Sequence, residues 1–202
     1  LLMCSNIDQL KKKIIYRSNY RGTKEMDKLL GTFTEKNINE IKSRFENNSV
    51  LMGNSRGTYG GGLVSSDEKV RKDTISFVKQ MCGLSVKLGC PSTYLRPGSM
   101  NENGAWLPHS ENHTEKVFDR LIDSTRQICS VAESEGMILI LEGGYVSPVY
   151  SAKRVKDFFE GVGSKNLKFN QDPVNFLSSL EQAYNTKEFL EEFFSERISI
   201  EN

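Results

Sequence analysis

Residues 132–144 read AESEGMILILEGG, and this stretch decides the fold. The consecutive apolar residues 138–141 predict a strand buried on both faces, as in a parallel sheet covered by helices. Gly136 is a helix stop before the strand, and two glycines follow the strand closely. The strand ends on a carboxylate, Glu142, and burying such a charge is costly unless it is paired or holds a metal. Glu142 is therefore the first candidate for a functional residue.

The chain on both sides of this stretch alternates strand patterns with helix patterns. The apolar stripe of one helix contains Val70, Phe77, Met81, Leu84 and Leu88. Strands that alternate with helices favour a parallel α/β sheet or barrel. The predicted order is strand 49–54, helix 65–89, strand 92–96, helix 114–136, strand 137–142, helix 151–163, strand 166–172 and helix 186–196, and residues 198–200 could begin one more strand.

Residues 1–48 have a different pattern. Short amphipathic helices are predicted between residues 7 and 46, and no strand signal appears there. The sequence therefore divides into a helical segment, 1–48, and an α/β unit, 49–202.

The composition limits the class of partner. The 202 residues contain 27 basic and 26 acidic side chains, which gives no reason to expect nucleic acid or an acidic membrane surface as a partner. No apolar run approaches the roughly 20 residues of a membrane span. The 4 cysteines have no C-x-x-C spacing, which favours free thiols in a cytoplasmic protein over disulfides or a zinc site.

Polar residues follow three successive predicted strands: Arg96, Glu142 and Asp172. In parallel α/β proteins the working face lies at the carboxyl ends of the strands. A Glu and an Asp on adjacent strands could share a divalent cation such as Mg²⁺, Mn²⁺ or Zn²⁺. The alternative is structural, with Glu142 capping a helix and Asp172 beginning a turn with Pro173. Spacing alone leaves both interpretations open.

Four stretches of the α/β unit carry a resemblance to a known family. They are AESEGMILILEGG at 132–144, SAKRVKDFFEGVGSKNLKFNQDPVNF at 151–176, VKLGCPSTYLRPGS at 86–99 and VRKDTISFVKQM at 70–81. Over residues 49–195 the chain resembles the sugar phosphate isomerase/epimerase family, the xylose isomerase-like TIM barrels. The resemblance implies that Glu142 and Asp172 are two of four ligands of a divalent metal ion, with Glu142 also a catalytic base. It also implies proton transfer on a sugar or sugar phosphate through an enediolate.

The loop at 96–114 gathers Arg96, Trp106, His109, Asn112 and His113 at the same face. We expect Arg96 and His109 to bind substrate hydroxyl or phosphate groups, and Trp106 to pack against a sugar face. The alternative is that Trp106 plugs the mouth of the barrel while the polar residues are solvated.

The chain also departs from this family. Both histidines, His109 and His113, precede Asp172, whereas the resemblance implies a ligand His and a second ligand Glu on later strands. A complete barrel needs about 250 residues, and the first strands are replaced here by the helical segment. We therefore expect a partial (β/α) TIM-type barrel, a fragment with an incomplete site. Its open sheet edges should be covered by oligomerisation or by a partner.

The helical segment carries a second resemblance. Arg21, Gly22 and Glu25 form an R-G-x-x-E motif, which resembles the SdhE-like FAD assembly factor family. This resemblance implies that the three residues contact a partner flavoprotein, succinate dehydrogenase, and assist its covalent flavinylation. The alternative is a surface salt bridge between Arg21 and Glu25. Two resemblances in one chain are consistent with a natural fusion, a fragment or a misassembled gene.

Overall fold

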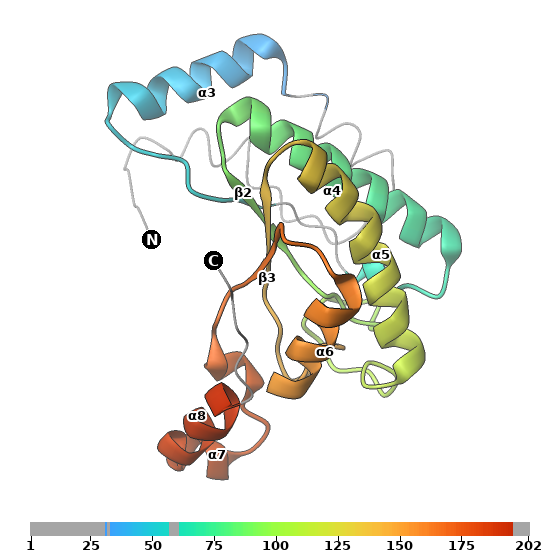
Figure 1. Cartoon of the computed structure of the whole chain (residues 1–202). Helices are drawn as coiled ribbons and strands as arrows, with labels where there is room; N and C mark the ends of the chain where they lie inside the picture. The colour runs from blue at the N-terminus through green and yellow to red at the C-terminus, as the bar shows by residue number, and fades with distance from the viewer. Residues whose placement is uncertain (1–30, 32, 57–60, 196–202) are drawn as a thin grey trace.

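The computed structural model describes residues 31, 33–56 and 61–195. Within these residues a four-stranded parallel sheet runs in the order β1-β2-β3-β4 (Figure 1). The strands are β1 Ser55–Arg56, β2 Ser92–Leu95, β3 Ile138–Leu141 and β4 Leu167–Phe169. Neighbouring strands in the sheet are also consecutive in the sequence, and helices connect them, which is the arrangement of βαβ units. The prediction of a parallel α/β fold is confirmed.

Three helices cover one side of the sheet: α4 Glu68–Leu88, α5 Glu115–Ser134 and α6 Ala152–Val162 (Figure 1). Their ends follow the sequence signals. Thr114 and Ser151 accept backbone N–H bonds as N-caps of α5 and α6, while Gly89 and Gly163 end α4 and α6 in the left-handed conformation. In the described part of the chain, no helix has the length and apolarity that crossing a membrane requires.

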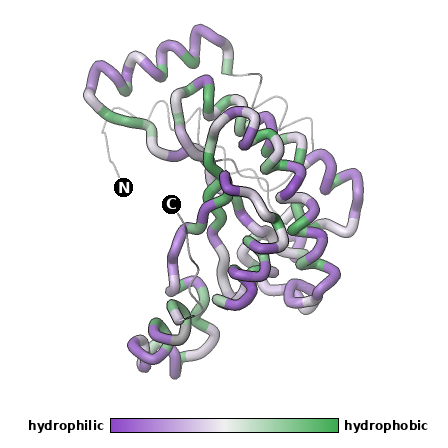
Figure 2. The backbone as a smooth tube through the Cα atoms, viewed as in Figure 1, coloured by the Kyte–Doolittle hydropathy of each residue, from purple (hydrophilic) through white to green (hydrophobic). Residues whose placement is uncertain are grey.

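The remaining helices lie at the two ends of the sheet (Figure 1). Helix α3, Glu35–Asn47, lies near the amino ends of the strands, and its outer turns are largely hydrophilic (Figure 2). Helices α7, Leu180–Tyr184, and α8, Thr186–Ser195, lie beyond the carboxyl ends. Two short 3₁₀ helices, η1 Gly62–Val64 and η2 Pro173–Phe176, complete the described elements.

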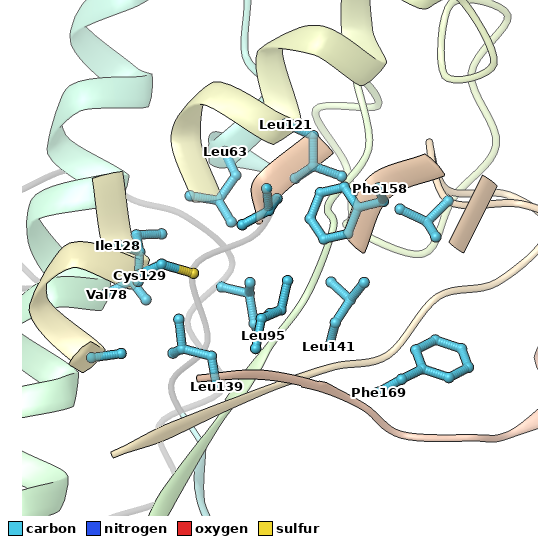
Figure 3. Packing of buried hydrophobic residues seen from close by; sticks show 14 of the residues in the cluster. Leu63, Val78, Leu95, Leu121, Ile128, Cys129, Leu139, Leu141, Phe158 and Phe169 are labelled. Atoms are coloured by element: carbon cyan, nitrogen blue, oxygen red, sulfur yellow. The ribbon is translucent and has the colours of Figure 1, made fainter. Parts of the chain in front are cut away.

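The face of the sheet toward α4, α5 and α6 is apolar. Leu95, Leu139 and Leu141 are fully buried and point from β2 and β3 toward Leu121 and Phe158 of the helices (Figure 3). Alternate residues of a strand point to opposite faces, so these leucines belong to one layer. This contact anchors the sheet on the helices and fixes which face of β3 is buried.

The opposite face of β3 is more accessible than the sequence predicted. Ile138 is 36% exposed and Ile140 is half-buried, whereas Leu139 between them is fully buried. The prediction of a strand buried on both faces is therefore wrong for β3. In the described part of the chain, a layer of helices covers only the other face of the sheet (Figure 1).

The predicted strand at 49–54 is also wrong, because its first residues close α3. The amides of Asn48 and Val50 both donate to the Phe45 carbonyl, and Ser49 has a positive φ of 52°. Leu51 is 91% exposed. The last of the short helices predicted between residues 7 and 46 is confirmed as α3, and the earlier ones lie almost entirely outside the described residues.

Three buried cysteines lie in or beside this core. Cys82, Cys90 and Cys129 are free thiols, as predicted, and Cys4 lies outside the described residues. Burial raises the pKa of Cys82 to about 12 and the pKa of Cys129 to about 11. Both thiols therefore stay protonated near neutral pH and pack as small apolar side chains.

Replacing Leu139 by alanine should lower the free energy of unfolding by about 2–5 kcal/mol, because it leaves a cavity in the buried layer. Ile138→Ala on the same strand is the matched control and should cost about 1 kcal/mol, since Ile138 is already partly exposed. Urea denaturation followed by circular dichroism measures both. Equal losses would contradict the assignment of one buried and one accessible face.

Candidate active site

Three polar residues follow β2, β3 and β4 at one level of the sheet: Arg96, Glu142 and Asn170. Leu141 pairs with Leu95 in register. The Glu142 amide donates to the Leu95 carbonyl at 3.2 Å, and the Asn170 amide donates to the Leu141 carbonyl at 2.7 Å. The ladder thus continues past the strand ends. It places these three residues in one row, on the face opposite to Leu141.

Glu142 is half-buried, and a neighbouring amide orients its carboxylate. Its Oε1 accepts a hydrogen bond of 3.0 Å from Nδ2 of Asn170. Ser151, and not Glu142, caps the helix that follows, α6. Asn170 is not among the site residues predicted from the sequence, although it comes directly after β4, as Glu142 does after β3.

Asp172 lies beyond the end of β4. The predicted strand 166–172 is too long, since β4 ends at Phe169. Asp172 precedes the turn η2, so the turn with Pro173 exists. The Asp172 amide donates to the Asn170 carbonyl at 3.0 Å, and Asp172 Oδ2 accepts a weak hydrogen bond from Asn175 Nδ2 at 3.4 Å. These contacts hold a half-buried carboxylate at the same edge of the sheet as Glu142.

Trp106 and Arg96 lie together over this edge. The guanidinium carbon of Arg96 is 5.9 Å from the Trp106 ring centroid and 5.7 Å from that of Tyr94, within cation–π range. A Cβ atom on Gly144 would lie 3.1 Å from Cζ3 of Trp106 and 3.1 Å from the Asn175 carbonyl oxygen. The absence of a side chain at Gly144 therefore lets the indole lie against the turn after β3.

The two histidines have different surroundings. His109 is exposed, and its Nδ1 accepts a hydrogen bond of 3.2 Å from the Glu111 amide, within its own turn. His113 Nε2 lies 2.6 Å from the Tyr145 carbonyl oxygen, and its ring stacks on Tyr150 with centroids 4.0 Å apart. The structure thus brings His113, rather than His109, to the loop that follows Glu142.

An ion pair ties the beginnings of α5 and α6 together next to this loop. Arg154 donates to both carboxylate oxygens of Glu115, and its guanidinium carbon lies 4.3 Å from the centroid of the Phe118 ring. The hydrogen bond from Arg154 lowers the pKa of Glu115. Because Glu115 is exposed, this pair orders the two helix ends more than it stabilises the fold.

The carboxylates of Glu142 and Asp172 have the chemistry to hold a divalent cation, since both offer hard oxygen ligands from one edge of the sheet. In the described ranges, no group of three or more His, Cys, Asp and Glu side chains gathers. The described residues therefore fit part of a metal site. Arg21, Gly22 and Glu25 lie outside the described residues.

Parallel strands joined by helices on one side of the sheet, with polar residues just beyond their carboxyl ends, are the arrangement found in (β/α) barrels. A comparison with protein families matches residues 18–200 to the family described as xylose isomerase-like TIM barrel. The chain belongs to this family, and the predicted partial barrel is confirmed. The matched residues include the R-G-x-x-E motif, and the comparisons give no support to the resemblance to FAD assembly factors.

Solved structures with the same fold include an epimerase and two metal-bound proteins. A 3-keto-D-glucoside 4-epimerase from E. coli is 15% identical with a TM-score of 0.58, over 76% of this chain and 61% of its own. A xylose isomerase-like TIM barrel protein from Mycobacterium smegmatis, in complex with magnesium, is 13% identical with a TM-score of 0.62, over 82% and 55%. An IolI protein with a bound zinc atom is 16% identical with a TM-score of 0.54, over 69% and 47%.

Because these sequence identities are low, the structural similarity establishes a shared fold only. The chain spans about half of the length of these solved chains, between 47% and 61%. A comparison with curated proteins yields no match.

Gly144→Ala should move the indole of Trp106, because the new methyl group would meet both Trp106 and the Asn175 carbonyl at 3.1 Å. We expect a lower melting temperature and a red shift of the fluorescence emission, which reports on Trp106 because the sequence contains a single tryptophan. Gly83→Ala is the control, since nothing lies within 4 Å of a Cβ there and helix α4 gains from alanine. An unchanged emission spectrum in Gly144→Ala would contradict the placement of Trp106.

Proposed function

We propose that this chain contributes to a sugar isomerase or epimerase that moves a proton next to a carbonyl group with the help of a divalent cation. The observation that carries the proposal is the half-buried Glu142 at the end of β3, at one sheet edge with Asp172, in a chain of this family. The solved relatives support it, since one is named as an epimerase and two contain magnesium or zinc.

In this proposal Glu142 is the base that takes and returns the proton. A general base must lie within hydrogen-bond reach of the proton that it removes, in a fixed orientation. The Asn170 side chain supplies part of that orientation through its 3.0 Å hydrogen bond to Oε1. Because Asn170 directly follows the neighbouring strand β4, the position of the base depends on the sheet itself and not on the loop alone.

Arg96 and Trp106 would hold the substrate. The indole offers a flat apolar surface for the C–H face of a sugar ring, and the guanidinium offers donors for hydroxyl or phosphate oxygens. Their cation–π contact of 5.9 Å keeps the two groups side by side over the strand ends. His109, which is exposed on the same β2–α5 loop, would be a further substrate-binding residue.

Glu142 and Asp172 would hold the divalent cation, Mg²⁺, Mn²⁺ or Zn²⁺, as two of its ligands. When bound, such a cation polarises the substrate carbonyl and makes the neighbouring proton more acidic. Other ligands would come from residues outside the described part, since the described residues gather no third carboxylate or imidazole with these two.

The edges of the sheet also need a partner in this proposal. Among the described strands, β1 and β4 each pair on one side only. Exposed edges of a sheet favour pairing with another strand. A further part of a barrel or an oligomeric partner would cover them and would enclose the row of Arg96, Glu142 and Asn170.

Calorimetric titration with Mn²⁺ tests the metal site. The wild-type protein should bind one Mn²⁺, and Glu142→Gln and Asp172→Asn should each weaken binding by about tenfold or more, which corresponds to at least about 1.4 kcal/mol. Glu160→Gln, on the exposed side of α6, is the matched control and should bind like the wild type. The proposal fails if the wild type does not bind Mn²⁺, or if Glu142→Gln binds it equally well.

Fluorescence of Trp106 tests the substrate class. A ketohexose phosphate should quench the emission at lower concentration than the free ketohexose, because Arg96 can pair with the phosphate. Arg96→Ala should remove this preference while the free sugar still quenches, and Arg96→Lys should retain part of it. A preference that survives in Arg96→Ala would show that Arg96 does not bind the phosphate.

A further inference from the structure

The loop from Glu142 to Ser151 is hydrogen-bonded to other loops on two sides. On one side the Tyr145 amide donates to the Asn175 carbonyl at 2.7 Å. On the other side two adjacent residues reach consecutive carbonyl oxygens. Asn112 Nδ2 donates to Val146 O at 2.7 Å, and His113 Nε2 lies 2.6 Å from Tyr145 O. The loop after Glu142 is thus held through its backbone, whatever side chains it carries.

Asn112 makes this connection from a buried position, with 1% exposure. Its Oδ1 accepts from the Met100 amide at 2.8 Å, and its Nδ2 also donates to Ser99 Oγ at 2.8 Å. Ser99 Oγ in turn donates to the Leu107 carbonyl at 2.7 Å. One buried amide therefore joins both ends of the β2–α5 loop to the carbonyl of Val146.

The two loops that Asn112 joins carry the two halves of the proposed site. The β2–α5 loop carries Arg96 and Trp106, the substrate-holding groups, and the β3–α6 loop starts at Glu142, the base. A buried amide that loses a partner carries a desolvation penalty, so this connection resists separation of the loops. A proton transfer depends steeply on such positions, because a misplacement of about 1 Å can cost about 100-fold in rate.

We propose that Asn112 is a positioning residue that sets the distance between the Arg96–Trp106 loop and Glu142. This inference rests on the proposed function for its catalytic meaning. Its structural content, that Asn112 holds Trp106 and the turn after β3 together, can be tested without substrate or metal.

The chain offers a matched control for this amide at the opposite end of the sheet. Asn166 Nδ2 donates to the Met137 carbonyl at 2.7 Å and to the Ala132 carbonyl at 3.4 Å, next to the amino end of β3. Asn166→Ala thus removes the same chemical group and a similar bridge between distant segments. It does so far from the carboxyl ends of the strands.

The experiment compares Asn112→Ala with Asn166→Ala in the full chain. Both variants should lower the melting temperature. Only Asn112→Ala should raise the acrylamide quenching of Trp106 severalfold and weaken Mn²⁺ binding measured by calorimetry. Asn112→Leu serves if Asn112→Ala does not fold. Leucine fills a similar volume but cannot donate to the Val146 carbonyl, so this variant should raise the quenching of Trp106 as well.

The inference is overturned if Asn112→Ala loses melting temperature as Asn166→Ala does while Trp106 quenching and Mn²⁺ affinity stay at the wild-type values. Unchanged quenching in Asn112→Leu also counts against it. If the wild type does not bind Mn²⁺, the proposed function fails, and the quenching comparison still decides whether Asn112 holds the two loops together.

Discussion

The parallel register between β2, β3 and β4 is the constraint on which the candidate site depends. Leu141 pairs with Leu95, so the residues that follow, Arg96 and Glu142, share one level and one face. A slip of one residue in a strand would turn its polar end into the apolar layer. The burial of Leu139 and Leu141 against the helices prevents such a slip, because it would expose both leucines. The apolar layer therefore positions the polar row.

Close approaches between loops extend this order beyond the strand ends. A Cβ atom on Gly143 would lie 2.7 Å from Cζ of Phe176 and 2.8 Å from the Val149 carbonyl oxygen, so the turn after β3 needs glycine there. Gly144 gives the corresponding space to Trp106. The two glycines thus let the loops after β2 and β4 lie against the turn after β3, and the buried amide of Asn112 connects the loops after β2 and β3.

Much of this fold could be predicted from the sequence, because its long elements carry local signals. Helices α4 and α5 have apolar stripes, caps and stops, and their observed bounds lie close to the predicted ones. The short elements are harder to predict from the sequence. The apolar run at 49–54 closes α3, since Ser49 adopts a positive φ, and β4 is too short to place Asp172 at its end.

Three site residues lie where the sequence predicts them, at the carboxyl edge of the sheet: Arg96, Glu142 and Trp106. Two of them directly follow strands, and Trp106 lies on the loop after β2. The role of Asn112 depends on a contact with Val146, distant in sequence, which no local pattern encodes.

The most direct test of the central claim is the position of a bound cation. A crystal of the full chain soaked in Mn²⁺ salt would show an anomalous difference peak. We expect a peak about 2.0–2.3 Å from carboxylate oxygens of both Glu142 and Asp172, at the carboxyl edge of the sheet. A peak that contacts neither residue, or only other carboxylates of the chain, would contradict it.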